Sequence, residues 1–203
     1  MAILGEEGGF ERKAQDIWIV GPIDGTVNFA RRMPDWAISI ACTDGNVITH
    51  GVIHAPDLNI IAWAGRFWRS FINGRQIQFG SAVLPKLIVA LGYSPGSALS
   101  DYLKWIERLS NADIERRRYG AATICFLGVL AGWFDAFYEP ALNIWDAAAG
   151  VLLVDKASGI VSHDPLASFL LAPSDVLARN SQSAELAEIL ASGTRFSRGY
   201  MPA

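Results

Sequence analysis

The most informative segment of the sequence is Trp18-Ile19-Val20-Gly21-Pro22-Ile23-Asp24-Gly25-Thr26-Val27-Asn28-Phe29. Its apolar start, taken with the two residues before it, predicts a short buried strand over residues 16–20. Glycine, proline and aspartate then break the strand over residues 21–26. A turn of this kind can expose consecutive backbone N–H groups at the start of a helix, and such groups suit a phosphate.

Further strand-like segments follow this turn at residues 36–43, 47–54 and 60–64. Asp44-Gly45-Asn46 separates the first two and is a strong hairpin signal, and Asn73-Gly74 marks another turn. The first half of the chain is therefore predicted to be largely antiparallel sheet.

In the second half, strand-like and helix-like periods alternate, which is typical of a mixed α/β domain. The predicted strands are residues 88–93, 134–139, 160–162 and 176–178. The predicted helices are residues 100–110, 121–131, 145–157 and 184–190. No repeat, low-complexity tract or linker divides the sequence, so we predict one layered α/β domain over residues 1–203.

The composition narrows the class of function. Of the 203 residues, 51% are apolar and 18% are charged, and the formal net charge is −3. This weakly acidic balance argues against a nucleic-acid groove, because such grooves need a clustered basic surface. The one basic run, Glu115-Arg116-Arg117-Arg118, is interpreted as a solvated edge.

The location of the protein is inferred from its apolar segments and cysteines. The uncharged stretch from Tyr119 to Phe134 is short for a bilayer span and contains three glycines, so a buried helix is expected. Cys42 and Cys125 lie among apolar residues and are predicted to be buried free thiols. The sequence opens with no secretory leader pattern. We therefore expect a cytoplasmic protein without a membrane partner.

Acidic residues stand where the predicted elements begin or end. Asp24 follows a strand, Asp146 heads the helix that starts near Trp145, and Glu6 and Glu7 lie between glycines. Taken singly, they are typical of a turn residue, a helix N-cap and solvated tail residues. Taken together, three carboxylate sites at element ends are typical of a hard-cation site, because Mg²⁺ takes oxygen ligands.

Five motifs resemble, in the same order, those of the inositol monophosphatase family. Residues 18–29 resemble its signature Trp-hydrophobic-hydrophobic-Asp-Pro-Ile-Asp-Gly-Thr-x-Asn-Phe, and residues 145–150 resemble its signature Trp-Asp-x-Ala-Ala-Gly. Gly5-Glu6-Glu7 resembles a Gly-Glu-Glu motif, while residues 120–122 and 137–139 fall where the family keeps substrate-contacting residues. The resemblance covers essentially the whole chain and implies the family's sugar phosphatase fold, with alternating α and β layers.

The resemblance implies a phosphomonoesterase that works with two or three metal ions, Mg²⁺ or alternatively Mn²⁺. Glu6 would bind one metal and, with the hydroxyl of Thr26, would orient the attacking water. The carbonyl oxygen of Ile23 would be another ligand of that metal, and Asp24 and Asp146 would hold a second one. Cations placed in this way clamp the attacking and leaving oxygens of an in-line displacement.

The resemblance also implies how a substrate binds. The backbone N–H groups of Gly25 and Thr26 would receive the phosphate, while Glu139, Asp146 and the turn at Ala122 would contact the alcohol portion. The implied substrate is inositol monophosphate or a similar small phosphorylated polyol. The implied substrate-binding residues are Asp24, Gly25, Thr26, Ala122, Glu139 and Asp146.

Two departures from the family pattern bear on activity. Gly21 stands where the family carries an aspartate that bridges two metals, so weaker cation binding and impaired hydrolysis are expected. The family's N-terminal helical pair, which covers the sheet, is expected to be lacking, because only residues 1–4 precede the Gly-Glu-Glu motif. An uncovered apolar face favours a homodimer. The alternative to an enzyme is therefore a non-catalytic homologue that serves as a dimerisation or protein-binding module.

Overall fold

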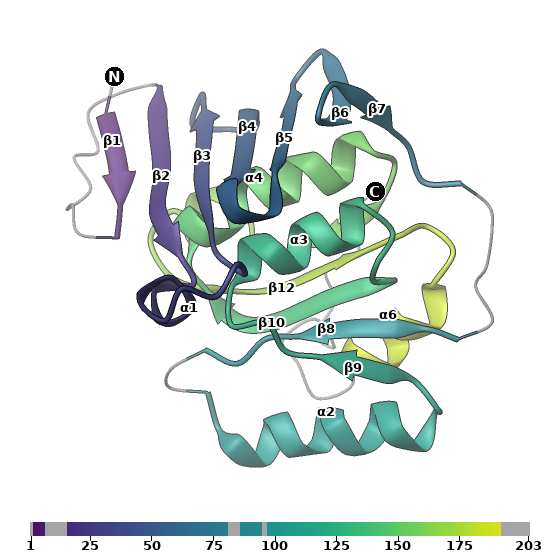
Figure 1. The fold of residues 1–203 in the computed structure, drawn as a ribbon. Coiled ribbons are helices and arrows are strands. Elements are labelled where there is room, and N and C mark those ends of the chain that lie inside the picture. Colours follow the sequence, from purple (N-terminus) through teal and green to yellow (C-terminus); the bar gives the residue numbers. More distant parts are fainter. Residues whose placement is uncertain (1, 7–15, 81–85, 95–96, 192–203) are drawn as a thin grey trace.

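The computed structural model describes residues 2–6, 16–80, 86–94 and 97–191. In this part of the chain, two β-sheets enclose a layer of helices (Figure 1). This mixed and layered arrangement confirms the fold class predicted from the sequence.

The first sheet follows the order of the chain. Its neighbouring strands are antiparallel, except that β1 runs parallel to β2. A short 3₁₀ helix, η1 (Pro56–Leu58), joins its fourth and fifth strands. In the described residues its strands are β1 (Ala2–Gly5), β2 (Ile17–Asp24), β3 (Ala37–Thr43), β4 (Ile48–Ala55), β5 (Ile60–Gly65), β6 (Trp68–Ile72) and β7 (Arg75–Ile77).

The second sheet is mixed and mostly built from the second half of the chain. In spatial order its described strands are β11 (Ile160–Ser162), β12 (Ser174–Arg179), β10 (Ala136–Leu142), β8 (Ile88–Leu91) and β9 (Glu115–Arg117). The three strands β10, β8 and β9 are parallel, whereas β12 is antiparallel to both of its neighbours. The carboxyl ends of three strands therefore point to the same edge, where α/β folds commonly bind ligands.

The described helices occupy three places. Between the sheets lie α3 (Ala122–Leu130) and α4 (Ile144–Lys156), and α2 (Leu99–Asn111) and α6 (Ala184–Ala191) lie outside the second sheet (Figure 1). The short helices α1 (Thr26–Ala30) and α5 (Leu166–Phe169) follow β2 and precede β12. All nine residues of α3 are buried, because both sheets and α4 surround it. No helix of the described residues is long and apolar enough to cross a membrane.

One face of the first sheet is apolar and exposed in the described residues. Its strands alternate, so Leu4, Ala41 and Ala62 point toward the helices and are buried. Ile3 and Ile61, which point the other way, are 67% and 44% exposed. The lack of a covering helical pair and the homodimer both stay predictions.

Most element predictions are confirmed, and the differences have physical reasons. Asp146 is not the N-cap that its position suggested, because Asn143 precedes the first residue of α4 and Asp146 lies in the first turn. The solvated edge at residues 115–117 is itself a strand, β9, whose exposed side chains carry no apolar alternation. Cys42 and Cys125 are free thiols as predicted, although only Cys125 is fully buried.

Candidate functional site

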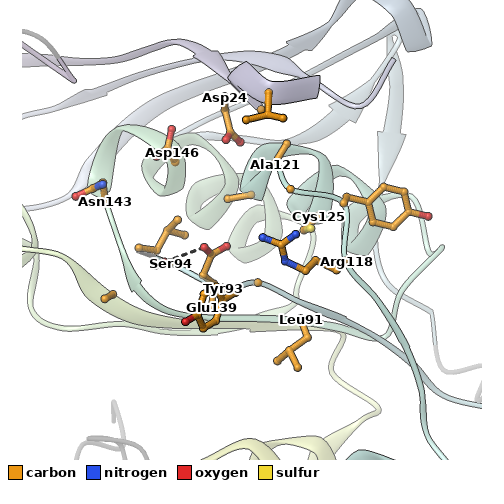
Figure 2. Close-up of a pocket in the computed structure, with 18 of the residues that line it drawn as sticks. Asp24, Leu91, Tyr93, Ser94, Arg118, Ala121, Cys125, Glu139, Asn143 and Asp146 are labelled. Atoms are coloured by element: carbon orange, nitrogen blue, oxygen red, sulfur yellow. Dashed lines mark hydrogen bonds between the residues drawn. The ribbon is translucent and has the colours of Figure 1, made fainter. Parts of the chain in front are cut away.

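A cleft of about 430 Å³ opens where the parallel strands of the second sheet end. The segments that follow β8, β9 and β10 form one side, and the end of β2 with the start of α3 and α4 forms the other (Figure 2). Asp24 and Asp146 lie on the side of the helix starts, and Glu139 faces them across the cleft (Figure 2). Residues more than one hundred positions apart therefore share one pocket.

Asp24 ends β2 and holds the start of α3 in place. Its Oδ2 accepts hydrogen bonds from the backbone N and from Oγ1 of Thr123, both at 2.7 Å. The carboxylate thus caps a helix that lies 99 residues away in sequence. Burial raises the pKa of Asp24, although the hydrogen bonds from Thr123 and neighbouring backbone groups oppose that rise.

Gly25 makes the turn that carries the chain from β2 into α1. Its φ of 83° lies in the left-handed region, and a Cβ there would lie 2.9 Å from the carbonyl oxygen of Asp35. A side chain at this position would therefore be strained. Gly25 and Thr26 both line the cleft beside Asp24.

Asp146 lies in the first turn of α4, and its environment disfavours a charge. Burial raises its pKa to about 8, and the negative charges of Asp24, Glu6 and Glu139 add to the rise. The carboxyl groups of Asp24, Glu6 and Glu139 therefore lie within electrostatic range of Asp146. A bound cation would relieve this repulsion.

Glu139 is fixed on β10 by residues that follow the adjacent strand β8. Ser94 Oγ donates a 2.8 Å hydrogen bond to Oε1 (Figure 2), and Gly92 leaves room for the carboxyl group, which a Cβ at that position would overlap. Burial raises the pKa of Glu139 to about 7. The hydrogen bond from Ser94 and the positive charge of Arg118 oppose this rise, whereas the negative charge of Asp24 adds to it. The group is therefore partly protonated near neutral pH.

Position 21 points into the same site from β2. A Cβ on Gly21 would lie 3.4 Å from Oδ1 of Asp146 and only 2.8 Å from the carbonyl oxygen of Trp145. Ser39 on β3 pairs with Gly21, and its buried Oγ has no hydrogen-bond partner among the residues that the structure describes. A carboxylate at position 21 would stand next to Asp146, but the start of α4 would have to move to admit it.

The donor chemistry of the site fits a hard divalent cation, although the grouping is incomplete. Asp24 and Asp146 are oxygen donors with raised pKa values, and Glu6 lies close enough to Asp146 to affect it. Within residues 2–6, 16–80, 86–94 and 97–191, however, no three acidic, histidine or cysteine side chains are grouped as a metal site. At position 21, where a Cβ would lie 3.4 Å from Oδ1 of Asp146, glycine supplies no side-chain oxygen.

The structure brings most of the predicted site residues together. The cleft is not lined by Glu6 or Ile23, and Glu7 lies outside the described residues. The roles of all these residues stay predictions. Those that line the cleft are Asp24, Gly25, Thr26, Ala122, Glu139 and Asp146.

Sequence reasoning missed four polar residues of the site. Ser94 and Thr123 hold the carboxyl groups of Glu139 and Asp24, and Arg118 lines the cleft. Ser39 lies opposite Gly21. Serine and threonine in apolar segments give no signal of their own, and Arg118 was hidden in a run of three arginines.

Comparisons with known proteins agree with the fold. A model of the inositol monophosphatase family matches residues 1–196. The Nus factor SuhB of Pseudomonas aeruginosa is 36% identical over 170 residues, which cover 79% of this chain and 63% of that protein. The fructose-1,6-bisphosphatase/inositol-1-monophosphatase of Thermotoga maritima is 36% identical over 160 residues, which cover 79% of this chain and 61% of that protein.

Solved structures give the same result. The extragenic suppressor protein suhB from Bartonella henselae superimposes with a TM-score of 0.83 at 30% identity, covering 94% of this chain and 76% of that one. The Thermotoga maritima IMPase superimposes with a TM-score of 0.80 at 31% identity, covering 94% of this chain and 74% of that one. The chain spans 61–63% of the length of the first two curated relatives.

Proposed function

We propose, from the premise that the chain belongs to the inositol monophosphatase family, that it hydrolyses a small phosphate monoester with the help of Mg²⁺ or Mn²⁺. The substrate class is inositol monophosphate or a similar polyol phosphate. The observation that carries the proposal is that Asp24 and Asp146 line one cleft beside the Gly25–Thr26 turn, where burial raises the pKa of each carboxyl group.

One cation would be held by Glu6 and the carbonyl oxygen of Ile23, and a second by Asp24 and Asp146. When bound, they supply positive charge that polarises the phosphate and activates water. The environment of Asp146 supports this need for positive charge, because burial and the neighbouring carboxyl groups disfavour the ionised form of its side chain. Thr26, exposed at the cleft, would orient the attacking water together with Glu6.

The substrate would be oriented by groups on both sides of the cleft. The N–H groups of Gly25 and Thr26 would receive the phosphate, because a turn at a helix start presents such donors together. Glu139 would accept a hydrogen bond from a hydroxyl of the alcohol portion, and Ser94 keeps its carboxyl group in position for this. Ala122, at the start of α3, would contact the same portion of the substrate.

Gly21 is expected to impair this activity. It offers no oxygen where the cleft is most acidic, and a divalent cation needs negative charge to lose part of its hydration. The buried Ser39 hydroxyl, left without a partner opposite Gly21, supports the view that a polar side chain belongs at position 21. Hydrolysis by this chain is therefore proposed to be slow.

A second function is favoured by the apolar outer face of the first sheet. Ile3, Ile40 and Ile61 are 67%, 36% and 44% exposed on three of its strands. A family member that has lost a metal ligand can still bind another protein through such a face. The alternative function is therefore a non-catalytic dimerisation or protein-binding module.

Release of phosphate from myo-inositol 1-phosphate in the presence of Mg²⁺ separates the two functions. Asp146→Asn should remove the release that the unmodified chain shows, because it removes a cation ligand. Asp155→Asn is the matched control, since Asp155 lies at the other end of α4 and pairs with Lys156. Equal release by the unmodified chain and by Asp146→Asn would reject the hydrolytic function.

A further inference from the structure

The hairpin between β5 and β6 presents aromatic side chains to solvent. Its turn is formed by Arg66 and Phe67, and Phe67 and Trp68 are 89% and 58% exposed. Behind them, Trp63 and Phe71 stack with ring centroids 4.3 Å apart, and Trp68 meets Trp63 edge to face at 6.0 Å. We call Trp63, Phe67, Trp68 and Phe71 the hairpin cluster.

The hairpin cluster is a continuous patch rather than a set of scattered rings. Its four side chains line a depression of about 290 Å³ together with Arg69 and Gln76. Single exposed apolar residues are common on protein surfaces, but contiguous exposed patches mark binding sites. The cluster is therefore a candidate binding surface.

The segment that carries the cluster is basic, although the chain as a whole has a formal net charge of −3. Residues 58–100 contain no aspartate or glutamate, and their basic residues are Arg66, Arg69, Arg75 and Lys86. Arg66 pairs with Asp44 at 3.1 Å. Among the residues that the structure describes, no carboxylate oxygen lies within 4.0 Å of the side-chain nitrogens of Arg69. The charge of the patch therefore favours an anionic partner.

The hairpin lies at the other end of the first sheet from the acidic cleft. Asp24, at the end of β2, pairs with Ala37 at the start of β3, whereas Gly65 pairs with His50, which pairs in turn with Cys42 near the end of β3 (Figure 1). A strand as long as the eight-residue β2 spans roughly 26 Å. This length exceeds the Debye length of about 8 Å at physiological ionic strength, so the carboxylates of the cleft are screened from the hairpin.

The arrangement of the rings bears on the kind of anionic partner. Trp63 and Phe71 are only 11° from parallel, so each covers one ring face of the other. Single-stranded nucleic acids bind by stacking their bases on open ring faces. Phe67 and Trp68, by contrast, extend into solvent at the turn, where they can enter an apolar layer.

Exposed aromatic rings flanked by arginine are suited to the boundary between lipid headgroups and acyl chains. We propose that the hairpin cluster binds the surface of an anionic lipid bilayer, with Phe67 and Trp68 inserted and Arg69 bound to a lipid phosphate. Such a contact needs no membrane-spanning helix. It departs from the expectation of a protein without a membrane partner, which was based on spanning segments and a leader. The cleft, at the other end of the sheet, stays open to water.

The test is co-sedimentation with vesicles of phosphatidylcholine alone and of phosphatidylcholine mixed equally with phosphatidylglycerol. The chain should bind the mixed vesicles, and the binding should weaken as salt rises, because salt screens the arginine charges. Phe67→Ser should lower the partition coefficient about tenfold, since its side chain no longer leaves water for lipid. Arg69→Gln should lower it roughly fivefold.

Two matched controls change similar side chains outside the hairpin. Trp133→Ser removes an aromatic side chain that is 47% exposed after α3, and Arg116→Gln removes an exposed arginine of β9. Both should bind the mixed vesicles as the unmodified chain does. Because Phe67 is 89% exposed, Phe67→Ser should keep the melting temperature of the unmodified chain.

Three results with vesicles would overturn the proposal: no binding to the mixed vesicles, unchanged binding by Phe67→Ser, or equal binding to phosphatidylcholine alone. Sedimentation without vesicles tests a second copy of the chain as the partner. Self-association that Phe67→Ser abolishes, in a chain that binds no vesicles, would assign the cluster to that contact. Binding of a single-stranded oligonucleotide in place of vesicles, lost in the same variant, would assign it to nucleic acid.

Discussion

At position 21, one absent side chain affects both charge and packing. The site lacks the carboxylate that would stand beside Asp146, and the carbonyl oxygen of Trp145 lies 2.8 Å from where its Cβ would be. In a variant with an aspartate at position 21, the effect on charge and the effect on packing would act in opposite directions. A carboxylate there would help to bind cations, but it would crowd the start of α4.

Gly21→Asp should therefore raise phosphate release by orders of magnitude and tighten Mn²⁺ binding, while it lowers the melting temperature measured without metal. The added carboxylate would accept a hydrogen bond from Ser39 and share a cation with Asp146. Gly21→Ala is the control, because it brings the same steric conflict without a ligand, and it should be destabilised without gain. An ordinary enzymic rate in the unmodified chain would contradict the ligand argument.

A second prediction at this scale concerns Glu139, whose pKa is about 7 in the folded chain and 4.5 when unperturbed. Burial raises the folded value, so the folded state holds the proton more tightly, and stability falls as pH rises from about 4.5 to 7. Glu139→Gln should flatten this fall, so its melting temperature should exceed that of the unmodified chain increasingly toward pH 8.

Melting curves in EDTA between pH 5 and pH 8 check this expectation. The amide can still accept the hydrogen bond from Ser94, so packing changes little. Glu115→Gln is the control, because Glu115 is exposed and its pKa is lowered by Arg117 and Lys86. An offset between Glu139→Gln and the unmodified chain that does not change with pH would count against a titrating Glu139.

Among the elements, α3 depends on a residue outside itself. Its N-cap residue, Ala121, offers no side-chain cap, and the carboxylate of Asp24 accepts the Thr123 N–H in its place. Asp24→Ala should therefore lower the free energy of unfolding by about 1–3 kcal/mol, because it leaves buried donors at the helix start without an acceptor. Urea unfolding at pH 7 measures this loss.

Asp24→Asn separates the cap from the charge, since the amide retains an oxygen that can accept from Thr123. We expect it to be closer in stability to the unmodified chain than Asp24→Ala, yet to release no phosphate. If both variants lost stability equally, the charge of Asp24 rather than its hydrogen bonds would stabilise α3.

The elements themselves could largely be predicted from the sequence, because each follows from a local pattern. Residues 44–46 gave the hairpin between β3 and β4, and Asp44 Oδ1 indeed accepts from the N–H groups of Asn46 and Val47. The strand β9 could not be found, since its three residues are all charged and exposed. Its pairing with β8 depends on backbone hydrogen bonds that any side chain permits.

For the whole molecule, the site could be predicted only where a motif marked it. The contact of Asp24 with Thr123 spans 99 residues, and that of Ser94 with Glu139 spans 45. Both contacts arise because the parallel strands of the second sheet end close to the end of β2 and the start of α3, so that segments distant in sequence line one cleft. No local pattern contains this arrangement, so the family motifs supplied the carboxylates and the fold alone supplied Ser94 and Arg118.

The outer face of the first sheet gives the last prediction, which concerns self-association. Ile61 is 44% exposed there, and apolar area removed from water is worth roughly 25 cal/mol per Å². We expect a dimer at micromolar concentration, and Ile61→Asp should shift it toward monomer, because a carboxylate at the contact would be desolvated. Sedimentation across a concentration series measures the shift. Leu171→Asp is the control, since Leu171 is 56% exposed but follows α5 and belongs to no strand of the first sheet, and it should leave the dimer intact. A monomer at all concentrations would refute self-association through this face, and equal dissociation in both variants would place the contact elsewhere.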